Sequence, residues 1–359
     1  MKSWTYLEFS LEAEVIKIEH PTRGDDTRAW GPPFAPYKDG RDGEGESAYY
    51  LSVNRNKRSV AVSFKEKEGA KLIQTLAAKA DVIVENYLPG TLKKYGLDYN
   101  TLAKTNPRLI YASITGYGQT GPYSSRAGFD VMVEAEMGLM HITGPRDGPP
   151  VKVGVAVTDL TTGLYAVNSI LAAVIERSHS GQGQALDVCL SDCQVATLAN
   201  MAQSVLVTGK RDGGRYGTSH PSVVPYRAFR TKDGDILIAR VANRDVLERM
   251  IEDITSSKLS KEWLDIFEGT GLAYAKINDI KDTLEHSHVV ARDMIKEIQH
   301  PACGQLKVLN SPVKYSRTQP SIRTPPPLLG EHTDEVLRDV LGLDSAEIER
   351  LREKKAVGG

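Results

Sequence analysis

Asp159 is the residue of this chain whose position most directly suggests chemistry. It follows residues 151–158 and opens residues 160–177, a long apolar stretch with a helical pattern. A carboxylate at a helix N-terminus accepts backbone N–H groups and is kept ionised by the helix dipole. Position alone therefore predicts an ordinary N-cap, although an ionised aspartate there can also act as a nucleophile.

Basic and aromatic residues gather in three other segments. Lys65 follows a predicted strand, Lys94 comes shortly after the pair Asn86-Tyr87 at the end of another, and Arg126 lies in a Gly/Pro-rich loop. A tyrosine at a strand end can pack on a base, and basic side chains can hold phosphate groups. Each of these lysines taken alone is more typical of a solvated surface.

The elements that must position these residues alternate between strands and helices. The patterns predict strands at residues 60–64, 81–86 and 108–114, with helices at 68–80 and 92–105 between them. Strand and helix alternation is typical of a parallel sheet with right-handed crossovers. We therefore expect an α/β fold with a Rossmann-like sheet.

A Gly/Pro/Ser-rich loop at residues 116–128 directly follows the third strand, and a further strand at 186–190 and helix at 194–207 come later. Ligands of open α/β sheets bind at the carboxyl ends of the strands. Tyr117 and Gly118, which begin this loop, are therefore candidates for a substrate pocket.

The length of 359 residues favours more than one lobe. A hairpin pattern at residues 226–239, with a turn at 232–234, indicates the start of a smaller α+β domain. The expected organisation is a large domain at 1–208, a linker at 209–225, the small domain at 226–317, a second linker at 318–327 and C-terminal helices at 328–359 that return to the large domain.

Composition excludes several classes of function. The net charge of −1 provides no global field for nucleic acid or an anionic membrane, so neither partner is expected. Three cysteines are too few for a disulfide framework, and His286 and His288 lack further ligands, so no metal site is expected. No targeting signal is visible, and we expect a soluble protein of the cytoplasm or the mitochondrion.

Seven short motifs occur in one order along the chain, at residues 54–59, 84–90, 115–122, 126–130, 158–163, 181–184 and 326–333. Together they resemble the class III CoA-transferases, the family of formyl-CoA transferase, carnitine CoA-transferase and α-methylacyl-CoA racemase. The resemblance covers nearly the whole chain, and residues 138–145 and 217–220 look most like its succinate–hydroxymethylglutarate branch.

The resemblance implies transfer of CoA between carboxylic acids, possibly from succinyl-CoA, with Asp159 as the carboxylate that carries the acyl group. Acyl-CoA and small carboxylic acids are then the partners, and no permanently bound cofactor is implied. Gly217 and His220 are further candidates for the substrate pocket. The positions that match CoA contacts of the family are Val62, Lys65, Asn86, Tyr87, Lys94 and Arg126.

Two alternatives stay open. A racemase of the same family needs a histidine at the position of Phe129, and phenylalanine cannot transfer a proton. The family also normally begins with a strand and a Gly-rich turn, which residues 1–11 do not resemble, and a further stretch near residues 239–243 looks shortened. The resemblance therefore also allows a shortened, catalytically impaired paralogue that lacks its first βα unit and acts in another pathway.

Members of this family form interlocked homodimers, so the resemblance implies a homodimer. The linkers at 209–225 and 318–327 would then be the segments that thread one chain through the other.

Overall fold

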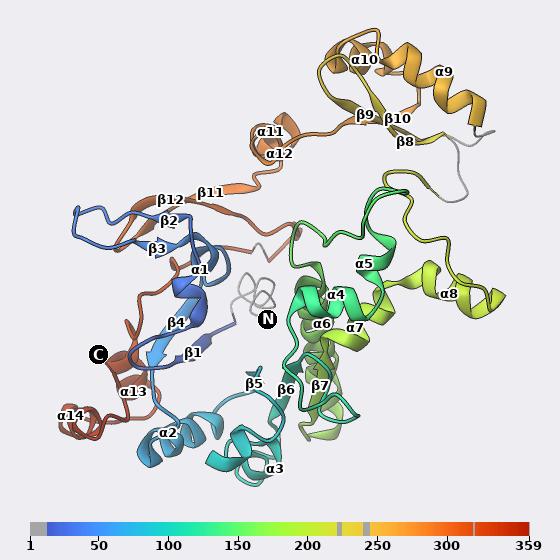
Figure 1. Cartoon of the computed structure of the whole chain (residues 1–359). Helices are drawn as coiled ribbons and strands as arrows, with labels where there is room; N and C mark the ends of the chain where they lie inside the picture. Colours follow the sequence, from blue (N-terminus) through green and yellow to red (C-terminus); the bar gives the residue numbers. More distant parts are fainter. Residues whose placement is uncertain (1–12, 221–224, 240–244, 319, 359) are drawn as a thin grey trace. The chain divides into compact units, whose positions relative to one another are not determined.

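The computed structural model describes four stretches of the chain, residues 13–220, 225–239, 245–318 and 320–358. They form two compact units, each described by itself here (Figure 1). Unit 1 contains the described residues of Met1–Val133, Val155–Thr197 and Asp293–Gly359. Unit 2 contains those of Glu134–Gly154 and Leu198–Arg292.

These bounds differ from the domains expected from the sequence. Residues 134–154 and 198–208, expected in the large domain, belong to unit 2, and residues 293–317, expected in the small domain, belong to unit 1. That stretch forms an antiparallel hairpin of β11 (Ile295–His300) and β12 (Gly304–Leu309). The hairpin packs within unit 1, where Lys38 donates its backbone N–H to the carbonyl of Ala302 at 2.9 Å. The hairpin therefore extends the larger unit, and no sequence pattern had predicted it.

The centre of unit 1 is a three-stranded parallel sheet in which β6 (Ile110–Thr115) lies between β5 (Val82–Glu85) and β7 (Ala185–Cys189). Every residue of β6 is buried. A strand covered on both faces has a continuous apolar sequence, which is why this run predicted a strand.

A second parallel pair is formed by β1 (Val15–Glu19) and β4 (Lys57–Ala61). Within the described residues, β1 pairs only with β4, and β5 pairs only with β6. The predicted strands are therefore present and parallel, but they lie in two sheets instead of one. Whether a first βα unit is missing stays a prediction.

The connection from β4 to β5 is α2 (Lys67–Ala77), as predicted. The next predicted helix, at residues 92–105, is instead a 3₁₀ turn, η4 (Leu92–Tyr95), followed by the short α3 (Tyr99–Leu102). Gly96 separates them in a left-handed conformation with φ of 66°. A left-handed glycine is the usual C-terminal stop of a helix, which explains the division.

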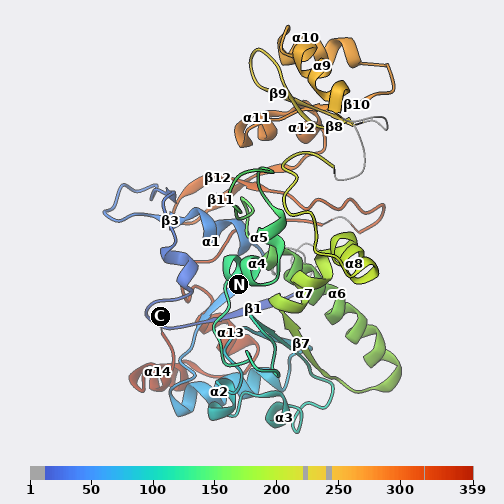
Figure 2. The ribbon, with the colours of Figure 1, turned by 45° about the vertical axis from the view of Figure 1, so that its right-hand side comes forward.

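The longest helix is α6 (Val157–Ser180), which packs on β6, β7 and α7 (Leu190–Thr197) (Figure 2). It is long and apolar enough to cross a membrane by length and composition, and 44% of its most apolar window is buried within the protein. Core helices of many proteins share these properties. The sequence prediction that no membrane is bound remains untested.

The C-terminal helices complete a hydrophobic core around β4 and α2. α13 (Thr333–Asp339) packs on β4 and against α14 (Ser345–Glu353). Burial of aliphatic side chains from all four elements stabilises this core by the hydrophobic effect. Its most buried members are Val60, Val62, Leu72, Val336, Leu337, Ile348 and Leu351.

Unit 1 also contains an ion pair buried at the end of β1. The guanidinium of Arg28 donates to both carboxylate oxygens of Glu19, at 2.9 and 2.8 Å. Arg28 also donates to the hydroxyl of Tyr50 at 2.6 Å and to the carbonyl of Pro327 at 3.1 Å. Burial alone raises the pKa of Glu19, but the hydrogen bonds and charge of Arg28 outweigh it and hold that pKa below its ordinary value.

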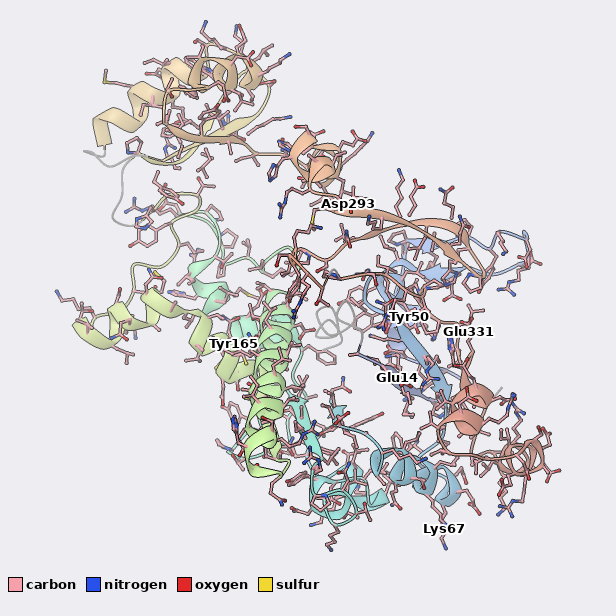
Figure 3. The ribbon with its side chains drawn as sticks, turned by 180° about the vertical axis from the view of Figure 1, so that it is seen from behind. Glu14, Tyr50, Lys67, Tyr165, Asp293 and Glu331 are labelled. Carbon is pink, nitrogen blue, oxygen red and sulfur yellow. The ribbon has the colours of Figure 1, made fainter. Side chains whose placement is uncertain are left out.

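This ion pair joins segments that are distant in sequence. Glu19 ends β1, Arg28 lies in η3 (Asp26–Ala29), and Tyr50 lies in α1 (Ala48–Val53) (Figure 3). Ser59 of β4 adds a third bond, donating its hydroxyl to Glu19 at 2.7 Å. The two short strands β2 (Phe34–Ala35) and β3 (Glu46–Ser47) complete this region.

Unit 2 is built around the predicted hairpin of β8 (Tyr226–Arg230) and β9 (Asp235–Ala239), to which β10 (Ala273–Lys276) adds a third antiparallel strand. Phe229, Ile236 and Trp263 are buried in its core. One helix, α4 (Asp130–Glu136), begins in unit 1 and ends in unit 2. The helices that lie wholly in unit 2 are α5 (Leu139–Ile142), α8 (Ala199–Thr208), α9 (Asp245–Thr255), α10 (Ser260–Phe267), α11 (Ile280–Glu285) and α12 (Ser287–Ala291).

We predict that Arg28→Ala lowers the free energy of unfolding by about 3–5 kcal/mol at neutral pH, because it leaves Glu19 buried without its counter-charge. Urea unfolding measures this change. Arg23→Ala is the matched control, since its ion pair with Asp26 is exposed on both sides and should contribute less than about 1 kcal/mol. A cost for Arg28→Ala no greater than that of the control would contradict the assignment.

Candidate active site

Asp159 lies in the first turn of α6, and only 5% of its surface is exposed. It is the third helical residue, and Ala156 occupies the N-cap position. The expectation that Asp159 is an ordinary N-cap is therefore wrong: helical backbone geometry begins at Val157, two residues earlier. The carboxylate is still close to the positive end of the helix dipole.

The backbone N–H of Asp159 is bound by a second aspartate. It donates to Oδ1 of Asp130, at the start of α4, at 2.9 Å. One of the N–H groups that a helix leaves unbonded in its first turn is thus satisfied from another element. Burial raises the pKa of Asp159, and the negative charge of Asp130 raises it further.

An aromatic pair lies within electrostatic range of this carboxylate. Burial raises the pKa of Tyr49, and the charges of Asp159 and Asp130 add to that shift. Trp30 meets Tyr49 edge to face, with ring centroids 5.0 Å apart. Both rings remain substantially exposed, at 41% for Trp30 and 37% for Tyr49. The site therefore combines a buried carboxylate with partly open aromatic faces.

The buried ion pair described above holds this aromatic pair in place. Trp30 follows Arg28 by two residues, and Tyr49 directly precedes Tyr50. The hydroxyl of Ser47 also donates to the carbonyl of Trp30. The contacts of Glu19 with Arg28 and Tyr50 thus fix both segments that carry an aromatic ring. Asp130, Tyr49 and Trp30 were not predicted as site residues. Asp130 ends the motif at residues 126–130, which was a signal for it, whereas Tyr49 and Trp30 lie in no motif.

The predicted nucleotide-binding segments converge at the ends of β4 and β5. Tyr87, which follows β5, packs edge to face on Phe64 with centroids 5.5 Å apart. Phe64 precedes the exposed Lys65 and also contacts Tyr95, whose neighbour Lys94 is exposed. The segments that carry Lys65, Tyr87 and Lys94 therefore share one aromatic cluster, formed by Phe64, Tyr87 and Tyr95. Asn86 is half-buried beside Tyr87.

Two of the predicted CoA contacts lie elsewhere. The side chain of Val62 is only 1% exposed and belongs to the core around β4. Arg126 is exposed, and its guanidinium lies 4.2 Å from the ring centroid of Tyr123. A cation over an aromatic face is a favourable arrangement that also leaves the guanidinium edge accessible.

The Gly/Pro-rich loop after β6 is closely packed. A Cβ atom on Gly116 would lie 2.5 Å from the Cα of Gly128, so the two backbones approach too closely for side chains. Tyr117 is nearly buried and packs on Tyr123, with centroids 5.6 Å apart. Gly118 donates its N–H to the hydroxyl of Thr115 at 2.8 Å. The N–H of Gly118 is therefore already bound.

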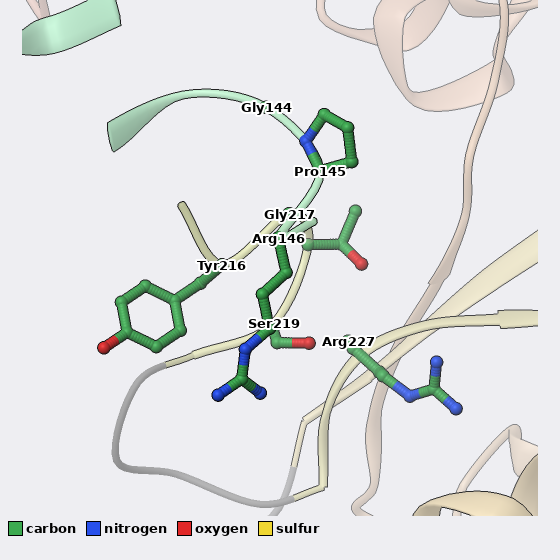
Figure 4. Close-up of a pocket in the computed structure, with 8 residues that line it drawn as sticks. Gly144, Pro145, Arg146, Tyr216, Gly217, Ser219 and Arg227 are labelled. Carbon is green, nitrogen blue, oxygen red and sulfur yellow. The ribbon is translucent and has the colours of Figure 1, made fainter. Parts of the chain in front are cut away.

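The other two predicted pocket residues belong to unit 2. Gly217 lines a hollow of about 530 Å³ in that unit (Figure 4). The ring of His220 lies 5.4 Å from that of Tyr226, centroid to centroid. The structure places these two residues in one unit and Asp159 in the other.

No group of three or more metal-binding side chains is found in the part of the chain that the structure describes. His286 caps α12, where its ring accepts the N–H of His288 at 3.2 Å. All three cysteines are free, and burial raises the pKa of Cys193 to about 11. A thiol with so high a pKa is protonated at neutral pH and is a poor nucleophile.

The chain matches a known protein family over most of its length. The model of CoA-transferase family III matches residues 11–242 and 237–333. The chain is 43% identical over 371 residues to the succinyl-CoA:glutarate CoA-transferase of Mus musculus, covering 95% of this chain and 83% of that protein. It is 38% identical over 360 residues to the succinate–glutarate CoA-transferase of Agrobacterium fabrum, covering 92% and 89%.

A solved structure has the same fold. The crystal structure of a CAIB/BAIF family protein from Brucella suis superposes with a TM-score of 0.85 at 35% identity, covering 94% of each chain. Family model, relatives and fold agree over most of the chain, and the protein therefore belongs to CoA-transferase family III.

Proposed function

We propose that this protein transfers CoA from a donor acyl-CoA to an acceptor carboxylic acid, with Asp159 as the nucleophile. The observation that carries the proposal is the buried carboxylate in the first turn of α6, whose backbone N–H is held by Asp130 at 2.9 Å. Membership of CoA-transferase family III supplies the reaction class.

The steps balance without a metal, redox group or external base. The Asp159 carboxylate attacks the donor thioester, forming a mixed anhydride and releasing the CoA thiolate. The thiolate attacks the aspartyl carbonyl of the anhydride, which gives an aspartyl–CoA thioester and frees the donor acid. The acceptor carboxylate attacks that thioester and again releases the thiolate. The thiolate finally attacks the acceptor acyl carbon, which forms the new acyl-CoA and restores Asp159.

Burial supports this chemistry for a physical reason. A desolvated carboxylate is a better nucleophile than a hydrated one, but desolvation also favours its protonated form. The helix dipole opposes that protonation because its positive end stabilises the anion. The position of Asp159 at the start of α6 therefore provides both reactivity and ionisation.

For the CoA-binding surface we propose Lys65, Asn86, Tyr87 and Lys94 around the aromatic cluster, with Arg126 in the Gly/Pro-rich loop. The exposed ring of Tyr87 provides a face for the adenine, and the exposed cations suit phosphate groups. The side chain of Val62 supports this surface from the core. Because the N–H of Gly118 is bound by Thr115, the reacting oxyanion must use other donors.

Succinyl-CoA is the donor we propose, with a dicarboxylic acid such as glutarate as the acceptor, because two similar proteins carry those substrates in their names.

Racemisation is less well supported. Phe129, next to Asp130, is 59% exposed but has no titratable group with which to move a proton.

We also propose that the protein forms a homodimer, as the family resemblance implies. α6 exposes apolar side chains that suit an interface, among them Leu164 at 46%, Leu171 at 54% and Ile175 at 62%, with Tyr165 beside them (Figure 3). Sedimentation equilibrium of the full chain would contradict this proposal if it gave a monomer at micromolar concentration.

The proposed function predicts that purified protein makes glutaryl-CoA from succinyl-CoA and glutarate, and that Asp159→Asn slows this exchange at least about a thousandfold. Mass spectrometry of new acyl-CoA species across a panel of acids measures it. Asp39→Asn is the matched control, an exposed aspartate that should leave the rate unchanged. Undiminished exchange by Asp159→Asn would contradict the nucleophile, and α-carbon deuteration without exchange would favour a racemase.

A second prediction concerns pH. Asp159 must be ionised to attack, and its pKa is raised, so the rate should fall on the acid side at a higher pH than an ordinary aspartate would give. Asp130→Asn removes a neighbouring negative charge yet keeps an oxygen that can accept the N–H of Asp159. We expect the acid limb of kcat/KM to move to lower pH in this variant.

The pH–rate profile of Asp39→Asn should coincide with that of the parent protein. If the acid limb of the kcat/KM profile of Asp130→Asn stays in place or moves to higher pH, the charge of Asp130 does not act on the reacting group.

A further inference from the structure

A buried hydrogen bond joins the first turn of α6 to α7, two helices that pack on each other (Figure 2). The hydroxyl of Thr158 donates to Oε1 of Gln194 at 2.5 Å, and the two residues are 0% and 1% exposed. The amide of Gln194 donates in turn to the hydroxyl of Thr197 at 3.1 Å. Buried polar groups are costly unless they bond to each other, so this contact specifies how the two helices meet.

The turn held by this bond is the one that carries Asp159, which directly follows Thr158. An α-helix leaves its first N–H groups without partners, and a side chain at the N-cap usually binds one of them. Here the N-cap residue is Ala156, and no side chain caps the helix from that position. Asp130 accepts the N–H of Asp159 instead. Gln194 holds the same turn from α7 through Thr158.

The helix that carries Gln194 is itself fixed at its start. β7 runs directly into α7, and Ser191 donates its backbone N–H to the carbonyl of Gly116 at 3.1 Å. The backbone of Gly116 lies against that of Gly128, two residues before Asp130. The two elements that hold the first turn of α6 are therefore connected to each other as well as to the turn.

Two neighbouring threonines of α6 make a different kind of bond. Thr161 donates its hydroxyl to the carbonyl of Val157 at 2.9 Å, and Thr162 donates to that of Thr158 at 2.7 Å. Bonds to a carbonyl one turn earlier are common for threonine in helices, and they connect α6 to itself. The hydroxyl of Thr158 instead reaches another helix, so its bond restrains where the first turn lies.

We infer that Gln194 is a positioning residue for Asp159, which it orients through Thr158. The inference rests on the proposed function in that Asp159 is the attacking group. A nucleophile reacts fast only when it is aligned with the bond that it attacks, and a displacement of about 1 Å can cost about a hundredfold in rate. Because Gln194 is buried, its effect on the reaction passes through the first turn of α6 and not through contact with a ligand.

Steady-state kinetics of the full chain with succinyl-CoA and glutarate tests this inference. Gln194→Leu introduces a side chain of similar size without a hydrogen-bonding group, and the hydroxyl of Thr197 keeps its bond to the backbone carbonyl at that position. We expect kcat to fall at least about tenfold and KM for succinyl-CoA to stay within about twofold, because the proposed CoA-binding surface does not include α7. Thr158→Val should have the same effect, and it tests the bond even if Gln194→Leu fails to fold.

Two further threonine variants separate positioning from a general loss of stability. Thr158→Ser keeps the hydroxyl and should retain most of the parent kcat. Thr161→Val is the matched control, because it removes a hydroxyl from the start of the same helix that bonds within α6, and it should leave kcat and KM unchanged. An unchanged kcat in both Gln194→Leu and Thr158→Val, or an equal loss in Thr161→Val, would overturn the inference.

A double variant tests whether the two residues act through one bond. Gln194→Leu and Thr158→Val each remove the same contact, so together they should lower kcat no further than either does alone. Losses that multiply in the double variant would show that Gln194 and Thr158 act separately, which would contradict the inference.

Deuterium uptake by the backbone of the full chain separates this inference from the proposed function, because it needs no turnover. We expect the peptide that contains the first turn of α6 to take up deuterium faster in Gln194→Leu than in the parent protein or Thr161→Val. If the parent protein transfers no CoA yet this difference is found, the proposed function fails and the restraint on Asp159 stands. If CoA transfer through Asp159 proceeds while Gln194→Leu changes neither kcat nor deuterium uptake, the inference fails and the proposed function stands.

Discussion

The architecture of the candidate active site depends on one buried ion pair, between Glu19 and Arg28. Two charges removed from water are stabilised only when their hydrogen bonds are satisfied, and here both carboxylate oxygens and the guanidinium are bound. The pair connects the end of β1 to η3 and, through Tyr50, to α1. Those two segments carry Trp30 and Tyr49, so the buried ion pair orders the aromatic pair whose phenol is within electrostatic range of Asp159.

A second constraint concerns Asp159 itself. In the proposed mechanism the residue must lose water to become reactive and must stay ionised to attack, and these requirements oppose each other. The first turn of a helix reconciles them, because backbone N–H groups and the helix dipole stabilise an anion without bulk water. Asp130 adjusts this balance in two ways, since it binds the N–H of Asp159 and its charge raises the pKa of that residue.

Local sequence patterns predicted the elements at the centre of unit 1. The strands β5, β6 and β7 and the helices α2 and α6 lie within a few residues of their predicted places, because hydrophobic periodicity reports burial directly. The division of the strands into two sheets was not predicted, since pairing partners are set by tertiary contacts. The β11–β12 hairpin was missed as well, because its strands alternate charged and apolar residues only loosely.

The residues of the candidate site likewise divide into those that the sequence predicted and those that it did not. Motif order led to the prediction of Asp159 and of the segments around Tyr87, and the structure places Asp159 in the first turn of α6 and Tyr87 in an aromatic cluster. Asp130 ends the motif at residues 126–130, but no spacing in the sequence relates it to the N–H of Asp159 that it binds. Tyr49 and Trp30 lie in no motif, and the Glu19–Arg28 pair orders the segments that carry them. Residues that act together through tertiary contacts leave no spacing in the sequence.

The central claim is that Asp159 becomes covalently bound during turnover. Incubation with succinyl-CoA, acid quenching and peptide mass analysis measure this directly. The account predicts CoA attached through a thioester to the peptide that contains Asp159, and a hydroxamate at that residue after treatment with hydroxylamine. Full exchange activity with neither product on that peptide would contradict the account.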